Sequence, residues 1–208
     1  MNITDFINSD EIKGISGKIL NTDFVREMAS GELIDDRFGY YLIQDDVYLK
    51  YYKMAGSSIK KITENDEIKD LYKLIGDDEP LFHINMLKQF NLKKENINEN
   101  MVNYTTYSYV NHLLRWSMDN DINGMYSMFA CQWSYEFIAE NIDDVNSKYK
   151  FWFDFYKNDK YRDITGLYFK ILNKSGINNL QKNIFKYGLL YELNYWIDSY
   201  EKYSNINI

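Results

Sequence analysis

The sequence is poor in the residues that form metal sites and disulfide bonds. Its 208 residues include one cysteine, Cys131, and two histidines, His83 and His112. A single cysteine cannot form a disulfide within the chain, and these three side chains do not complete the four-ligand set of a structural zinc site. Neither histidine has a glutamate three residues before it, as the Glu-x-x-His units of a carboxylate-bridged di-iron site require. We therefore expect neither a metal centre nor a bound cofactor.

Basic clusters and long apolar segments are also missing. Lysine and arginine number 24 against 31 aspartate and glutamate residues, which gives a net charge of −7. Such a chain has little with which to neutralise a phosphate backbone. No run of 18 apolar residues occurs, and the N-terminus lacks a basic segment followed by an apolar one. The sequence therefore predicts a cytoplasmic protein with no nucleic-acid partner and no membrane association.

Proline and glycine are too sparse to mark a linker. The chain contains one proline, Pro80, and ten glycines, with no low-complexity block and no internal repeat. A chain of this length can bury one substantial core. We expect a single domain over residues 1–208.

Apolar residues recur at helical spacing, and almost no stretch alternates with period two, so the fold class is predicted to be all-α. Asp35 is expected to cap the start of a long helix, and Gly31 to end the helix before it. Two polar segments, 91–100 and 141–148, are expected to be loops. The result is a compact bundle of about eight helices with long ones in the middle. The helical segments are predicted at 8–20, 22–30, 35–62, 65–75, 79–91, 103–119, 121–142, 145–157, 161–174 and 178–203.

Aromatic residues make up 17% of the chain, and most of them must belong to the core. One carboxylate stands out among them. Asp45 shares a helical face with Leu42 and Leu49, where a charge is unfavourable unless it is hydrogen-bonded or used in function. Its neighbour Asp46 turns toward Lys50, and we expect an ordinary solvated ion pair there.

A second carboxylate lies on an apolar face of the last predicted helix. Glu192 shares that face with Leu189, Tyr195 and Trp196. One interpretation is a partly buried glutamate whose oxygens are satisfied by tyrosine hydroxyls. The other is a general acid/base, because an apolar setting raises a carboxyl pKa toward neutrality, where proton transfer is most efficient.

The single cysteine lies in the largely apolar segment MYSMFACQWSYEF, residues 125–137. A cysteine in such a segment is more often a small hydrophobic residue than a nucleophile. No histidine, lysine or arginine within one helical turn of Cys131 could lower its pKa, whereas Tyr135 shares its face and could bond the thiol or a ligand. The segment by itself leaves the role of the cysteine open.

Five segments, taken in order, resemble the TenA family. They are FVREMASGELIDDRFGYYLIQDDVYLKYYKMAGSSIKK, NYTTYSYVNHLL, ACQWSYEF, YKFWFDFYKND and YELNYWIDSY, and together they extend over about residues 20–203. The resemblance implies a haem-oxygenase-like helical bundle that assembles as a homotetramer. It further implies an aminopyrimidine aminohydrolase, or thiaminase II, whose small-molecule substrate is 4-amino-5-aminomethyl-2-methylpyrimidine or thiamin. The products would be the hydroxymethylpyrimidine and ammonia, in thiamin salvage.

The family motifs also imply roles for particular residues. Cys131 matches the nucleophile of the C-x-W-x-Y motif, Glu192 the acid/base, and Asp45 the aspartate that holds the aminopyrimidine edge. Tyr107 is a rival to one of the pocket tyrosines, Tyr109. The substrate-binding tyrosines implied by the resemblance are Tyr48, Tyr109, Tyr135, Tyr156 and Tyr195, the last of which replaces a family phenylalanine.

The chain departs from the family in several places. Ala130 stands where a proline often precedes the cysteine, and the usual H-P-F opening is missing from the N-terminus. His83 matches a histidine that is common in the family, but we interpret both His83 and His112 as hydrogen-bonded structural residues. Since no basic residue flanks Cys131, we expect a protonated aminopyrimidine held by Asp45 to supply the charge that favours the thiolate.

Two other functions are consistent with such a bundle. One is a haem-oxygenase-like oxidase, which would need a richer set of histidines and glutamates than this chain has. The other is a non-catalytic protein that binds an aminopyrimidine or thiamin. A Cys131→Ser substitution separates an enzyme from a binding protein, because a binder has no turnover to lose.

Overall fold

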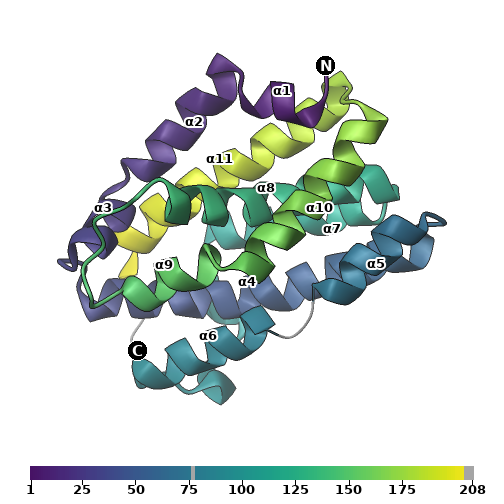
Figure 1. Ribbon diagram of the computed structural model, residues 1–208. Coiled ribbons are helices and arrows are strands. Elements are labelled where there is room, and N and C mark those ends of the chain that lie inside the picture. The colour runs from purple at the N-terminus through teal and green to yellow at the C-terminus, as the bar shows by residue number, and fades with distance from the viewer. Residues whose placement is uncertain (76–77, 204–208) are drawn as a thin grey trace.

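A computed structural model of the protein describes residues 1–75 and 78–203. Within them the chain forms eleven α-helices and no strand, so the all-α prediction is confirmed (Figure 1). Two 3-10 turns, η1 (Lys94–Asn96) and η2 (Glu99–Met101), lie in the predicted loop between α6 and α7. The α-helices are α1 (Ile3–Ile7), α2 (Asp10–Leu20), α3 (Asp23–Ser30), α4 (Asp35–Ile62), α5 (Asp66–Leu74), α6 (Asp78–Gln89), α7 (Tyr104–Ser117), α8 (Asp121–Glu140), α9 (Lys150–Tyr156), α10 (Asp159–Ser175) and α11 (Asn179–Glu201).

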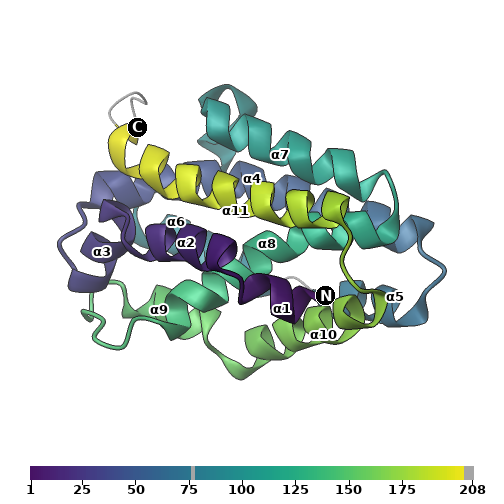
Figure 2. The same cartoon turned by 90° about the horizontal axis from the view of Figure 1, so that it is seen from above.

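Four helices form the centre of the bundle. Helices α4, α7, α8 and α11 contact one another, and α4 and α8 bury residues on every side because other helices surround them. Helices α2 and α3 lie against α11, α9 and α10 against α8, and α5 and α6 against α4 (Figures 1 and 2). The buried apolar side chains form one continuous core cluster. The predicted site residues all lie on the central helices or on α9.

Asparagine begins most of the long helices. The side chains of Asn103, Asn120, Asn158 and Asn178 each accept a hydrogen bond from the backbone N–H three residues ahead. Such a cap satisfies one of the free N–H groups at a helix start and is worth about 1 kcal/mol. The many asparagines between apolar segments therefore fix where α7, α8, α10 and α11 begin.

Two predicted helices begin in the wrong place. The segment predicted at 8–20 becomes helical at Asp10, because the Ser9 side chain accepts a hydrogen bond from the N–H of Ile12 and caps α2; the short helix α1 lies outside the predicted segments. The segment predicted at 145–157 becomes helical only at Lys150. Before it, the N–H of Asn146 donates to the carbonyl of Ala29 at 2.8 Å, which holds this stretch as a loop. The bundle thus contains more helices than the expected eight or so, because short helices pack as separate elements.

The boundaries of α3 and α4 test two predicted helix ends. Gly31 ends α3 with a φ of 82°, as expected for a left-handed glycine cap. The cap predicted for α4 is wrong. Ile34 is the N-cap, and Asp35 is the first helical residue, where its carboxylate pairs with Lys148 at 2.9 Å and suits the positive end of the helix dipole.

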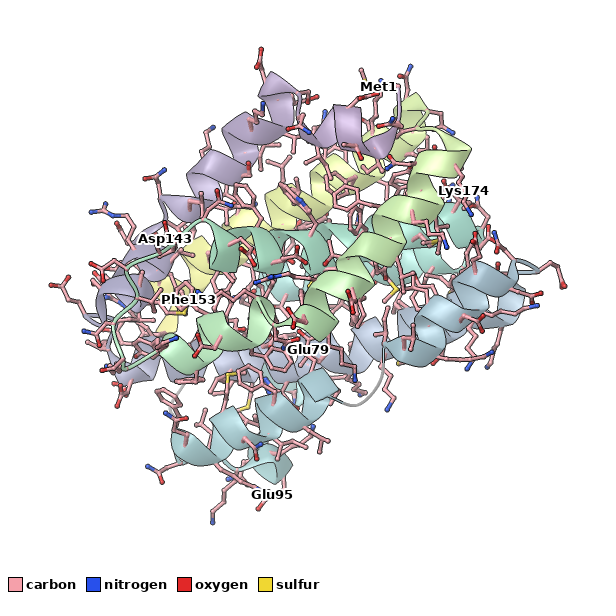
Figure 3. All side chains as sticks on the ribbon, in the orientation of Figure 1. Met1, Glu79, Glu95, Asp143, Phe153 and Lys174 are labelled. Atoms are coloured by element: carbon pink, nitrogen blue, oxygen red, sulfur yellow. The ribbon has the colours of Figure 1, made fainter. Side chains whose placement is uncertain are left out.

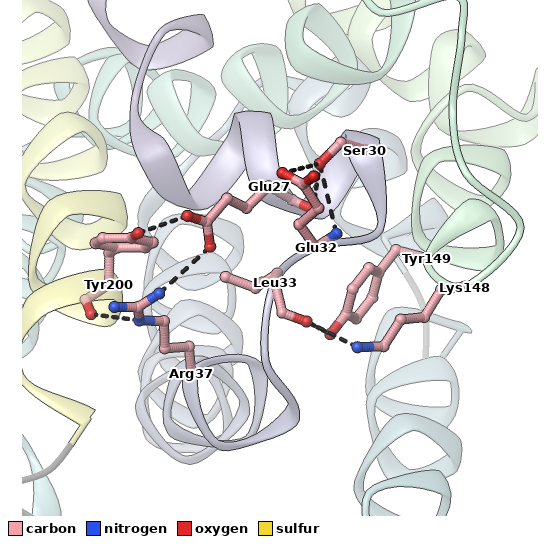
Figure 4. A network of polar contacts seen from close by, with 8 residues as sticks. All are labelled: Glu27, Ser30, Glu32, Leu33, Arg37, Lys148, Tyr149 and Tyr200. Carbon is pink, nitrogen blue, oxygen red and sulfur yellow. Dashed lines mark hydrogen bonds and ion pairs between the residues drawn. The ribbon is translucent and has the colours of Figure 1, made fainter.

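A polar network ties the end of α11 to α3 and α4 (Figure 4). The Tyr200 hydroxyl donates to Glu27 Oε1 at 2.6 Å, and Arg37 Nη1 lies 3.3 Å from Glu27 Oε2. Arg37 Nε donates to the carbonyl of Tyr200 at 3.0 Å. These contacts hold the C-terminal end of α11 against α3 and α4. Among the described helices, none has both the length and the apolar character needed to span a bilayer.

Candidate active site

The eight residues predicted from the sequence lie in one buried region, although they come from five helices. Helix α4 carries Asp45 and Tyr48, α7 carries Tyr109, α8 carries Cys131 and Tyr135, α9 carries Tyr156, and α11 carries Glu192 and Tyr195. Each of the eight is at most 5% exposed. A stretch of 147 residues separates the first acid from the second in sequence, so only the packing of α4 against α8 and α11 brings them together.

A very close helix contact sets the thiol next to one of the acids. At Gly188 a side-chain Cβ would lie 2.5 Å from the Cβ of Ala130, so only glycine allows α11 to approach α8 this closely. Cys131 follows Ala130, and Glu192 lies one turn beyond Gly188. Ala130 also keeps α8 helical without interruption from Asp121 to Glu140. In this chain the departure from proline therefore preserves a straight helix at the thiol.

The Glu192 carboxyl group is completely buried and only partly hydrogen-bonded. Tyr109 donates its hydroxyl to Oε1 at 2.7 Å. The other oxygen, Oε2, has no hydrogen bond of ordinary geometry to any described residue. Burial raises the pKa of this carboxyl to about 8, against the hydrogen bond from Tyr109 and the nearby Cys131 thiol, which lower it. At neutral pH most molecules therefore carry a protonated Glu192 that can give up a proton without a large cost.

The Cys131 thiol is neutral in this environment. Burial raises its pKa well above the ordinary value, and the charges of Glu192 and Glu79 raise it further. A thiolate is the nucleophilic form of cysteine, so a positive charge has to enter the site before this thiol can react readily. The described side chains around Cys131 that affect its pKa most are acids and tyrosines.

Asp45 is held by a histidine from α6. Its Oδ2 lies 2.9 Å from His83 Nδ1, and His83 Nε2 lies 3.4 Å from Asp46 Oδ1. Burial opposes a charge on His83, but the two carboxylates outweigh it and raise the pKa of the imidazole to about 9. His83 is thus a charged, buried residue that fixes the orientation of Asp45. Its predicted structural role agrees with this geometry.

The expectation for Asp46 is wrong. Its side chain is 12% exposed and lies 3.0 Å from Lys94 of η1, while Lys50 pairs with Glu99 instead. Burial raises the pKa of Asp46, but contacts with His83 and Lys94 outweigh it and lower the pKa. The loop between α6 and α7 covers this face of α4, and helical spacing alone could not indicate that cover.

Tyrosines and tryptophans form the walls around the acids and the thiol. The rings of Tyr48 and Tyr109 lie 4.8 Å apart, and those of Tyr135 and Tyr156 lie 4.7 Å apart. Tyr109 occupies the site and its rival Tyr107 does not, since Tyr107 is 61% exposed on the opposite face of α7. The hydroxyl of Tyr48 is buried and makes no hydrogen bond of ordinary geometry to a described residue, although it lies close enough to Cys131 and Tyr109 to oppose the rise that burial causes in the pKa of both. It can therefore bond a ligand.

A cavity of about 170 Å³ leads toward this region from the surface between α4, α5, α6 and α10. Its lining includes Tyr52, Glu79, Gln132 and Tyr161, but none of the eight predicted residues. The ring of Tyr52 lies 5.9 Å from that of Tyr48, and the ring of Tyr161 lies 5.1 Å from that of Tyr156, so both tyrosines border the predicted site. The cavity thus ends against side chains that also border the predicted site, and these side chains separate the two.

Sequence reasoning missed the second glutamate of this region. Glu79 lies four residues before His83, on the same face of α6, and that spacing was the available signal. The Tyr156 hydroxyl donates to Glu79 Oε1 at 3.1 Å. Burial, together with the charge of Asp45, raises the pKa of Glu79 to about 7. The site therefore has three carboxyl groups rather than two.

His112 has a different environment from His83. Its Nε2 lies 3.1 Å from the carbonyl oxygen of Ile184, and burial lowers the pKa of the ring to about 4. It is a neutral structural residue, as predicted. Across residues 1–75 and 78–203, no three His, Cys, Asp or Glu side chains are arranged so that they could hold a metal ion.

The arrangement suits covalent chemistry on a flat, basic heteroaromatic ligand. Aromatic walls can stack on its faces, the carboxylate of Asp45 can bind a protonated ring edge, and the thiol and Glu192 lie together to form and resolve a covalent bond.

Comparison with known proteins identifies the family of this chain. Residues 9–203 match the model of the TENA/THI-4/PQQC family. A Helicobacter pylori protein named aminopyrimidine aminohydrolase is 22% identical in an alignment 206 positions long. The alignment covers 91% of this chain and 94% of the relative. A solved TenA homologue from P. horikoshii OT3 is 26% identical with a TM-score of 0.87, covering 96% of this chain and 99% of that one. A solved TenA-like protein from Sulfolobus solfataricus P2 is 23% identical with a TM-score of 0.88, covering 97% of both chains.

Proposed function

Because the chain belongs to the TENA/THI-4/PQQC family, we propose that it is an aminopyrimidine aminohydrolase of the thiaminase II type. Its substrate is 4-amino-5-aminomethyl-2-methylpyrimidine, and it forms the hydroxymethylpyrimidine and ammonia as a step of thiamin salvage. The observation that carries the proposal is the juxtaposition of a buried thiol with a half-satisfied Glu192, beside the anchored carboxylate of Asp45. The name of the Helicobacter pylori relative supports the same reaction class.

The first half of the reaction uses all three groups. Asp45 binds the protonated edge of the pyrimidine, which makes the ring electron-poor. In the fraction of molecules whose Glu192 is ionised, the thiol of Cys131 gives its proton to that carboxylate, and the sulfur forms a bond to a ring carbon. The displaced electron pair moves through the ring and breaks the bond between the exocyclic methylene and the protonated amine, which leaves as ammonia. Covalent catalysis thereby divides one difficult displacement into two easier steps.

The second half restores the enzyme. Water adds to the exposed methylene and releases a proton, and the electron pair of the carbon–sulfur bond returns to sulfur. Glu192 then gives back its proton to the thiolate. A carboxyl whose pKa is about 8 can serve in both directions near neutral pH, because neither protonation state is strongly disfavoured.

Activation of the thiol depends on the substrate in this proposal. The described residues next to Cys131 raise its pKa, and a protonated aminopyrimidine would be the missing positive charge. The pKa of the Cys131 thiol can be measured by titration, with the thiolate absorbance as the signal. The titration is done with and without a substrate analogue that lacks the leaving amine. We expect the pKa of Cys131 to fall on binding. An unchanged pKa would remove substrate-dependent activation from the mechanism.

The function itself is tested with two substrates. The protein is incubated separately with the aminomethylpyrimidine and with thiamin, and release of ammonia or of the thiazole is followed. We expect turnover of the aminomethylpyrimidine, and a loss of at least about 10³-fold in the Cys131→Ser variant. Release that is equally fast in Cys131→Ser excludes the covalent mechanism. Absence of release from either compound in the unsubstituted protein excludes the enzyme and leaves a binding protein.

We also propose that the chain forms a homo-oligomer. Tyr104, Tyr107 and Tyr187 are 81%, 61% and 52% exposed on the adjacent helices α7 and α11. Figure 2 shows these two helices side by side at one edge of the bundle. We call these three tyrosines the α7/α11 aromatic patch. Exposed aromatic side chains that lie together are typical of contact surfaces between protein chains.

A further inference from the structure

The cavity that ends beside the predicted site has one acid in its wall. Among the described residues that line it, only Glu79 carries a carboxyl group, and most of the others are apolar or aromatic. Glu79 belongs to the first turns of α6 and faces the corner where α9 ends and α10 begins (Figure 3). A molecule that enters this cavity therefore meets Glu79 as the acid of its wall.

Contacts on both sides fix the position of Glu79. The hydroxyl of Tyr156 donates to its Oε1 at 3.1 Å, and the ring of Tyr156 packs 4.7 Å from that of Tyr135, one turn beyond Cys131 on α8. The charges of Asp45 and His83 act on the pKa of Glu79, and the charge of Glu79 in turn raises the pKa of Cys131. Glu79 is therefore held near the reacting groups, although it is not adjacent to them in sequence.

The proposed reaction places a particular chemical group at this point. If the pyrimidine ring lies between Asp45 and Cys131 with its leaving group toward the cavity wall, that group meets Glu79. In the aminomethylpyrimidine that group is a primary ammonium, and in thiamin it is a thiazolium ring. Both are cations, whereas an N-formylated amine is neutral. A partly buried carboxylate binds a cation much more strongly than a neutral amide.

We propose that Glu79 is the specificity-determining residue that binds the cationic leaving group, so that substrates with ammonium or thiazolium leaving groups are preferred to those with a neutral formylamide. This inference rests on the proposed function for its choice of ligand. Three lysines, Lys53, Lys60 and Lys160, also line the cavity, but their side chains are exposed to solvent. Water and salt screen the charges of exposed side chains more than the charge of the partly buried carboxyl group.

Binding measurements test this without relying on turnover. Calorimetry gives the Kd of the aminomethylpyrimidine and of its N-formyl derivative for the full chain in the Cys131→Ser background, with and without Glu79→Gln. We expect Glu79→Gln to weaken binding of the cation by about 10- to 100-fold, the loss typical of one charge-assisted hydrogen bond. Binding of the neutral derivative should change by less than about threefold. Glu79→Asp keeps the charge and should keep most of the preference.

A matched control is Glu136→Gln on α8. Burial raises the pKa of Glu136 too, but its side chain bonds Thr165 and does not line the cavity, so the preference should be unaffected. An equal loss for both ligands would make Glu79 structural and overturn the inference, as would no loss for either or an absence of binding of both compounds. If the ratio of Kd values shifts but the unsubstituted protein releases no ammonia, the enzymatic proposal fails and the role of Glu79 stands. If ammonia is released but the ratio of Kd values is unchanged, the enzymatic proposal stands and the role proposed for Glu79 fails.

Discussion

At the scale of single residues, one hydrogen bond controls the acidity of the central acid. The hydroxyl of Tyr109 donates to Glu192 Oε1 at 2.7 Å and favours the ionised carboxylate, while burial of the group works against it. The remaining oxygen has no partner of ordinary geometry among the described side chains. The acidity of Glu192 therefore depends on very few contacts, and the loss of one should be measurable.

We predict that Tyr109→Phe raises the pKa of Glu192 above its value of about 8. Loss of a hydrogen bond to the charged form is worth on the order of 1–2 kcal/mol, which corresponds to about one pKa unit. The limb of the profile of kcat against pH that belongs to Glu192 should move to higher pH by about that amount. Tyr107→Phe is the control, since Tyr107 is exposed on the other face of α7 and should leave the profile unchanged. A limb that moves to lower pH would show that another group titrates.

At the scale of elements, the contact between α8 and α11 determines whether the thiol and the acid meet. The two helices can approach closely because Gly188 has no side chain where it faces Ala130. Since Cys131 and Glu192 lie beside this contact, a small separation of the helix axes would change the distance between the reacting groups directly. A second contact, between α4 and α6, holds Asp45 through His83.

We predict that Gly188→Ala lowers both stability and activity. The added methyl would lie 2.5 Å from Ala130 Cβ, so the helices must move apart or strain. Such overpacking costs about 1–3 kcal/mol, and the displaced thiol should lose at least about tenfold in kcat. Gly166→Ala on α10 is the matched control, because no atom lies within 4 Å of its added Cβ. That variant should be slightly stabilised, by up to about 1 kcal/mol. Equal urea midpoints for the two variants would contradict the prediction.

The charged His83 that joins α6 to α4 makes stability depend on pH. Its pKa rises from 6.5 in the unfolded chain to about 9 in the folded one, so its contribution is complete below pH 6.5 and is lost as the pH rises through 9. We expect His83→Gln to lower the free energy of unfolding by on the order of 2–3 kcal/mol at low pH, with the difference vanishing at high pH. Urea denaturation at several pH values measures it.

The contribution of His112 to stability should depend on pH in the opposite direction to that of His83. Its folded pKa is lowered to about 4, so the stability it contributes is present above pH 6.5 and is lost as the pH falls through 4. His112→Gln should therefore cost most at the higher pH values. If both histidine variants show the same trend with pH, the charge assigned to His83 is wrong.

At the scale of the whole molecule, the surface is uneven. The chain carries a net charge of −7. The α7/α11 aromatic patch nevertheless exposes three large rings on neighbouring helices. Burying such rings against a second copy of the chain removes apolar area from water, at about 25 cal/mol per Å². The same helices carry Tyr109 and Glu192 on their inner faces, so assembly at this patch would also restrain the site from outside.

We predict that the protein is an oligomer in solution and that a charge in the patch dissociates it. Tyr107→Glu should shift the mass measured by light scattering toward the monomer mass, because a buried unpaired charge is unfavourable at an interface. Leu81→Lys is the control, since Leu81 is 58% exposed on α6 and lies outside the patch. A monomer in the unsubstituted protein, or a mass unaffected by Tyr107→Glu, would contradict the proposed interface.

The sequence by itself determined most of the helices, though not α1 or the start of α9, and which residues share a face. Helical spacing placed Asp45 and Glu192 on apolar faces, and both are buried there. The same spacing predicted the long helix at 35–62, where α4 is observed. Each of these features depends only on residues within a few helical turns of one another, so the spacing of apolar residues is enough to predict it. The roles of the thiol and the acids came from resemblance to a family, and they remain proposals.

Only the tertiary structure decided what covers each face and which charges meet. Asp46 was expected in solvent but is covered by η1 and His83, and Glu79 acquired its role from Tyr156 and from the cavity wall. The choice between Tyr107 and Tyr109 likewise depended on which face of α7 lies against α4 and α11. Burial and pKa depend on neighbours that are distant in sequence, and the spacing of residues along one helix contains no information about which helix will pack against it.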